Sequence, residues 1–169
     1  AMGCQKEIAA KIVAGGGDYV LALKSNHEKL HEAVANAFTE ALEADLPTGG
    51  MRRQVTVETN RGREERREYI AMSASKRLPG FADWAGLATL VMVLRITRVG
   101  GKETGEVSYF LSSLPPKVKA LAKVIRQHWS IESQLHWVLD VTFSEDASRI
   151  RKRHAPQTFL GQHVELRHF

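Results

Sequence analysis

The expected fold depends first on the segment RRQVTVETNRGREERREYIAM, which spans residues 52–72. Apolar and polar residues alternate from Val55 to Thr59, and this period of two is typical of a β-strand with one buried face. Asn60-Arg61-Gly62 has the composition of a tight turn. The chain is expected to return as a second strand over residues 64–72. The segment therefore predicts a β-hairpin near the centre of the chain.

Further strands are predicted on both sides of this hairpin. Two more strands are expected over residues 87–99 and 106–112, separated by a turn at Gly100-Gly101. Upstream, the short apolar run at residues 18–24 is typical of a strand that is buried in a parallel or mixed sheet.

Three helices are predicted around these strands. The first covers residues 6–14, and the second covers 27–44 with Asn26 as its N-cap. A long helix is expected over residues 117–141, with Ser113 as a possible cap and two prolines in its first turn. Together these patterns predict an α/β fold in which a β-rich segment, at about 52–112, precedes the last long helix.

Composition favours a globular protein with a polyanionic partner. The 169 residues carry 24 Lys and Arg against 19 Asp and Glu, a formal net charge of +5. Lys and Arg gain affinity for nucleic acid by displacing counterions from phosphates. The arginines cluster around residues 61–67 and 149–153, although the first cluster contains enough glutamate to be read as a solvated surface. One cysteine and the absence of a long apolar run favour a cytoplasmic protein.

The long helix carries the strongest chemical pattern. His128, Glu132, His136 and Asp140 are spaced four residues apart, which places them on one helix face. Three interpretations are open: a zinc site formed by the first three residues, a solvated polar face, or a carboxylate directed at a Mg²⁺ ion shared with DNA phosphate.

Several segments together resemble one protein family. The run HWSIESQLHWVLDVTFSED at residues 128–146 resembles the signature of ISAs-type bacterial insertion-sequence transposases, a group that includes the H-repeat-associated proteins. AMGCQ at 1–5, YVLALKSN at 19–26, GREERR at 62–67 and YFLSSL at 109–114 resemble further elements of that family in the same order. These matches spread over residues 1–156.

The resemblance implies a DDE transposase with a ribonuclease-H-like core. In this family two aspartates and one glutamate hold divalent metal, Mg²⁺ or Mn²⁺, and Glu132 occupies the place of the glutamate as catalytic residue and metal ligand. His136 and Asp140 are expected to support it indirectly. The wider group carries Tyr-x-x-Arg-x-x-x-Glu on this helix, but Ile125 and His128 stand at the tyrosine and arginine positions here.

The resemblance also implies DNA as the partner, both transposon ends and target, and a homodimer or larger assembly of the full-length protein. The residues expected to contact DNA are basic and lie in four parts of the chain: Lys24; Arg61, Arg63, Arg66 and Arg67; Arg126 and His128; and Arg149, Arg151, Lys152 and Arg153.

The position of the motifs predicts that the chain is the C-terminal part of such a domain. The second catalytic aspartate of the family would stand immediately before Ala1, and the first would lie farther upstream, so the core is expected to be incomplete and this fragment inactive. Residues 1–156 are assigned to the catalytic domain and 157–169 to a truncated or divergent tail. The alternatives are a non-catalytic nucleic-acid-binding remnant and a metal-dependent nuclease of the same fold.

Overall fold

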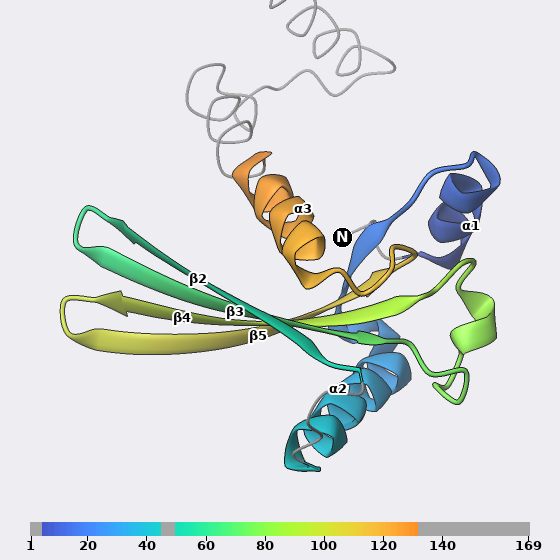
Figure 1. The fold of residues 1–169 in the computed structure, drawn as a ribbon, viewed down its shortest axis with the longest axis horizontal. Coiled ribbons are helices and arrows are strands. Elements are labelled where there is room, and N and C mark those ends of the chain that lie inside the picture. Colours follow the sequence, from blue (N-terminus) through green and yellow to red (C-terminus); the bar gives the residue numbers. More distant parts are fainter. Residues whose placement is uncertain (1–4, 45–49, 132–169) are drawn as a thin grey trace, which may run out of the picture. The chain divides into compact units, whose positions relative to one another are not determined.

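The computed structural model describes residues 5–44 and 50–131, and all the packing considered below lies within the unit formed by residues 1–126. None of the described helices is long and apolar enough to cross a membrane. The described α-helices are α1 (Lys6–Ala14), α2 (Glu28–Glu43) and α3 (Val118–Ile131), with 3-10 turns at Ser25–His27 and Phe81–Asp83. The described strands are β1 (Val20–Leu23), β2 (Arg52–Asn60), β3 (Arg63–Ser73), β4 (Thr89–Val99) and β5 (Lys102–Ser112) (Figure 1).

The five strands form one antiparallel sheet in the order β1-β5-β4-β3-β2. Arg61-Gly62 joins β2 to β3 and Gly100-Gly101 joins β4 to β5, with φ angles of 47°, 76°, 55° and 78°. Two successive positive φ angles give the turn twist that suits a two-residue hairpin. Both predicted hairpins and the mixed α/β class are therefore confirmed. Figure 1 shows the two turns at the same end of the sheet. We call the strand segments that lead to them, residues 53–68 and 94–107, the arm.

The expectation of a parallel or mixed sheet around β1 is wrong. β1 pairs antiparallel with β5, from Val20 opposite Ser112 to Leu23 opposite Tyr109. Polar contacts fix its start, because the Ser112 hydroxyl donates to the Tyr19 carbonyl at 2.8 Å and the Tyr19 amide donates to Ser113 Oγ at 2.9 Å. An apolar run indicates burial but carries no information on the direction of the neighbouring strand.

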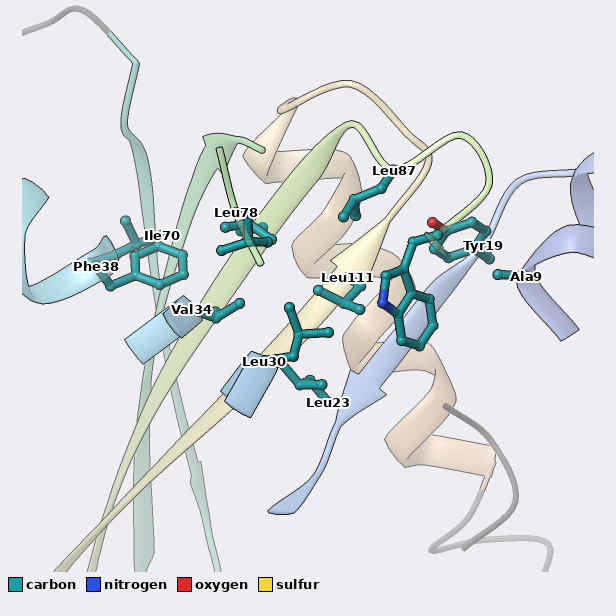
Figure 2. Close-up of a cluster of buried hydrophobic side chains, with 12 residues drawn as sticks. Ala9, Tyr19, Leu23, Leu30, Val34, Phe38, Ile70, Leu78, Leu87 and Leu111 are labelled. Carbon is teal, nitrogen blue, oxygen red and sulfur yellow. The ribbon is translucent and has the colours of Figure 1, made fainter. Parts of the chain in front are cut away.

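One face of the sheet is covered by α2, and we call it the α2 face. Leu30, Val34 and Phe38 recur every fourth residue on α2 and are buried against Ile70 of β3 and Leu111 of β5 (Figure 2). Ala9 of α1 and residues 78–90 complete the same cluster. The helical spacing of these apolar residues therefore explains why α2 packs with this side toward the sheet.

The opposite face of the sheet carries α3, and we call it the α3 face. Tyr69, Val91 and Phe110 are buried, and the strand register places them one residue away from the residues of the α2 face. Successive side chains of a strand point to opposite faces. Leu121 and Ile125 of α3 are also buried, and Figure 1 shows α2 and α3 on opposite sides of the sheet.

Two predicted helix starts need correction. Asn26 lies inside a 3-10 turn, in which the amide of His27 donates to the carbonyl of Lys24, and α2 begins only at Glu28, with His27 as its N-cap residue and no side-chain cap hydrogen bond. Ser113 does not cap α3 either. Its hydroxyl bonds Asp18 at 2.8 Å, and α3 begins only at Val118, after both prolines.

Candidate functional site

The residue with the strongest chemical assignment follows α3 directly. The predicted long helix is confirmed from Val118 to Ile131, and Glu132 is the next residue in the chain. His128 is exposed in the last turn of α3. The other predicted residues of this region lie, like Glu132, outside the described residues: His136, Asp140, Arg149, Arg151, Lys152 and Arg153. Their predicted roles remain predictions.

The described part of the site is an ionic network on the α3 face of the arm. Glu58 of β2 and Glu65 of β3 are register partners. Arg126 of α3 binds Glu58 through two hydrogen bonds, from Nε at 2.9 Å and Nη2 at 2.8 Å. This geometry matches the planar fork of a guanidinium to both oxygens of one carboxylate. The network therefore joins α3 to the arm just before Glu132 in the sequence.

Arg67 lies at the centre of this network. Its side chain is only 9% exposed, pairs with Glu65 and has its Nη1 atom 3.2 Å from Glu58. Arg63 reaches Glu65 at 2.7 Å, and Arg95 pairs with Glu106 and lies 3.9 Å from Glu65. Three carboxylates and four guanidiniums, Arg126 included, are thus gathered on one face.

The network keeps Glu58 and Glu65 ionised at neutral pH. The hydrogen bonds from Arg126 lower the pKa of Glu58 to about 2 against the opposing effect of burial, and Arg67 adds to the lowering. Burial alone would raise the pKa of Glu65, but the hydrogen bond from Arg63 and the charges of Arg67 and Arg95 hold it below its ordinary value. Groups that stay charged at neutral pH are suited to holding elements together and unsuited to proton transfer.

Within residues 5–44 and 50–131, the basic residues predicted to contact DNA do not form one patch. Arg63, Arg67 and Arg126 lie on the α3 face, whereas Arg66 lies on the α2 face, where it pairs with Glu68 at 3.2 Å. Arg61 in the turn at the tip of the arm and Lys24 just after β1 are exposed at separate places, and His128 is exposed in the last turn of α3. Phosphate binding by any of these residues is still a prediction.

The reading of the first arginine cluster as a solvated surface is wrong for its central members. Arg67 is 9% exposed and the Glu68 side chain is 5% exposed, because each is surrounded by ion-pair partners. Because successive side chains of a strand point to opposite faces, the sequence of β3 could have indicated that Arg67 and Glu68 lie on opposite faces of the sheet. No local signal could have identified Glu58 as the partner of Arg126, since 68 residues separate them.

Two kinds of comparison relate the chain to known proteins. A family model described as "Transposase DDE domain" matches residues 1–163. The chain is 38% identical to "Putative transposase YncI" of Escherichia coli O157:H7 over 165 residues, covering 95% of this chain and 42% of that protein. It is 34% identical to "H repeat-associated putative transposase YhhI" of Escherichia coli (strain K12) over 172 residues, covering 98% of this chain and 45% of that protein. The chain thus spans less than half the length of these curated relatives. No solved structure matches it.

Proposed function

This chain belongs to the transposase DDE domain family, and from that premise we propose that it is part of the catalytic domain of a bacterial insertion-sequence transposase. The complete protein would bind DNA in the cytoplasm and catalyse metal-dependent strand cleavage and transfer. The observation that carries the proposal is the family match over residues 1–163. It includes the helix α3 that leads, after the hairpins, to Glu132.

The fold assigned in this proposal is a ribonuclease-H-like core, incomplete in this chain, with the hairpins β2–β5 as its β-rich insertion. Support comes from the order of the elements, in which α1, β1 and α2 precede the two hairpins and α3 follows them. The boundary at residue 156 stays a prediction, and the family match extends past it to residue 163.

Glu132 is the catalytic residue in this proposal, and Mg²⁺ or Mn²⁺ is the cofactor. A divalent metal supplies stabilisation of the charge that develops on phosphate oxygens. Residues 5–44 and 50–131 include no group of three or more His, Cys, Asp or Glu that could hold a metal ion, so they do not form such a site by themselves. The proposal takes the two aspartates from a segment outside these 169 residues and predicts that the chain alone is inactive.

The chain's described residues would serve this function by holding the helix in place. Arg126 fixes α3 to β2 through Glu58, six residues before Glu132. Leu121 and Ile125 of the same helix are buried. Catalytic carboxylates are effective only when the element that carries them is held rigidly.

The proposal is tested by completing the domain. The missing N-terminal part would be taken from the YncI relative and joined to residues 1–169, and nicking of a duplex that contains transposon ends would be measured with and without Mg²⁺. We expect metal-dependent nicking by the joined protein and none by the 169-residue chain. Glu132→Gln should abolish nicking without weakening DNA binding, whereas Asp140→Asn should reduce nicking only mildly.

Three outcomes would contradict the assignment. Cleavage by the 169-residue chain alone would show that the chain holds a complete site. Normal nicking by the Glu132→Gln protein would remove Glu132 from catalysis. Nicking without any strand transfer would favour the nuclease alternative.

A further inference from the structure

Two arginines on the α2 face of the arm share one buried carboxylate. Glu68 of β3 pairs with Arg53 of β2 on one side and with Arg66 of β3, at 3.2 Å, on the other. The Glu68 side chain is 5% exposed, whereas those of Arg53 and Arg66 are 64% and 40% exposed. The negative charge is therefore covered and the two positive charges form the accessible part of the trio.

Two other arginines of the arm, Arg98 and Arg67, each have two carboxylate partners. Arg98 lies on the same face and is 62% exposed, but it bonds both Glu103 at 2.5 Å and Glu64 at 3.4 Å, and both carboxylates are exposed. Arg67, on the α3 face, is buried between Glu58 and Glu65. On the α2 face of the described arm, Arg53 and Arg66 are thus the pair in which cations outnumber the carboxylate between them.

We propose that Arg53 and Arg66, held in place by Glu68, form a contact site for the phosphate backbone of duplex DNA on the α2 face of the arm. This inference rests on the proposed DNA-related function and names a part of its binding surface. A guanidinium has five N–H donors in a fixed plane, so each arginine can bond Glu68 and still present donors to a phosphate. Holding both side chains in advance reduces the entropy that binding would otherwise cost.

The site recognises phosphate and not base sequence. Arginines that stand on an open sheet face can reach the phosphate backbone, and such contacts position a protein without reading bases. Val57, which lies opposite Arg66 in the register and is 58% exposed, gives this face an apolar component as well. A protein partner is therefore the competing occupant, and the experiment must separate the two.

The test measures how the affinity of the 169-residue chain for a labelled duplex of arbitrary sequence changes with NaCl concentration. Three variants each remove one positive charge: Arg53→Gln, Arg66→Gln and, as the matched control, Arg98→Gln. We expect the first two each to reduce the slope of log K against log salt by about 0.9, the value for one lost phosphate contact. Arg98→Gln should leave the slope unchanged.

Folding and charge are controlled separately. Circular dichroism and the thermal midpoint report whether each variant folds. If a glutamine variant fails to fold, Arg53→Lys or Arg66→Lys is measured in its place, since lysine keeps the positive charge. These lysine variants should keep the wild-type slope, because the phosphate contact survives as a point charge.

The outcomes distinguish this site from the function on which it rests. If the wild-type chain shows no salt-dependent DNA binding, both the proposed DNA binding by this chain and the site are wrong. If the wild-type chain binds but Arg98→Gln lowers the slope as much as the other two, net charge alone explains binding and the site is overturned. A third outcome also overturns the site. The salt slopes of Arg53→Gln and Arg66→Gln equal the wild-type slope, and either variant converts a dimer to a monomer in sedimentation. The face is then an interface between copies of the chain.

Discussion

At the scale of single residues, neighbouring arginines of β3 differ sharply in environment. Arg66 and Arg67 are adjacent in sequence, yet Arg66 is 40% exposed on the α2 face and Arg67 is 9% exposed on the α3 face. Arg67 separates Glu58 and Glu65, which would otherwise lie side by side as like charges. Its role in the described structure is therefore to neutralise two facing carboxylates.

Replacing Arg67 should cost far more stability than replacing Arg126. Arg67→Ala leaves two carboxylates without their shared buried partner, and breaking such a pair costs about 3 kcal/mol. Arg126 and Glu58 are each more than 40% exposed, so solvent screening limits their pair to about 1 kcal/mol or less. Urea unfolding of both variants measures the difference. An equal loss of stability would contradict the central role of Arg67.

The network should also make stability depend on acid pH. The pKa of Glu58 is about 2 in the folded chain, below its ordinary value of 4.5. A lowered folded-state pKa contributes stability that is fully present above about pH 4.5 and is lost as pH falls from 4.5 toward 2. The unfolding free energy should therefore fall more steeply over this range in the wild type than in Glu58→Gln. Parallel curves would show that Glu58 does not contribute in this way.

At the scale of elements, the two hairpins and α2 depend on one another. Phe38 of α2 stacks on Tyr109 of β5, with ring centroids 5.9 Å apart and planes inclined by 24°. His31, two turns earlier on α2, meets the same tyrosine edge-on at 5.0 Å. Tyr109 also pairs with β1 through Leu23, so α2 packs where the hairpins join the short edge strand.

Truncating Phe38 should therefore destabilise the fold strongly. Phe38 is fully buried, and replacing a buried phenylalanine by alanine costs about 3–5 kcal/mol through lost transfer energy and the cavity that remains. Leu42→Ala, on the same helix but at a position that is 47% exposed, is the matched control and should cost about 0.5 kcal/mol or less. Chemical denaturation of the two variants compares them, and similar midpoints would mean that α2 is not part of the stabilising core.

At the scale of the whole molecule, most of the arginines lie in two regions of the sequence. One is the arm, where most arginines pair with glutamates, and the other is the segment around residues 149–153. The family resemblance drawn from the motifs over residues 1–156 is confirmed by the family match. DNA binding by the second region is still a prediction.

That prediction can be measured directly. Replacing Arg151, Lys152 and Arg153 together by alanine should weaken binding to all duplex sequences alike. The salt slope should fall by about two to three, at about 0.9 per lost contact. A triple variant with an unchanged slope would mean that these side chains are only solvated. A loss of affinity for one sequence alone would indicate base contacts instead.

The sequence by itself determined the local parts of this protein. Alternation over residues 52–72 and the Gly100-Gly101 turn predicted both hairpins, and the motifs up to residue 146 predicted the family, because strand period, turn conformation and family motifs are all encoded in short segments. Only the tertiary structure decided the antiparallel placement of β1 beside β5 and the pairing of Arg126 with Glu58. It also decided which arginines are covered. Because side chains of a strand alternate between faces, the sequence places Arg66 and Arg67 on opposite faces of the sheet. Which of the two arginines becomes buried depends on where α2 and α3 pack. Those helix contacts join residues that are far apart in the chain.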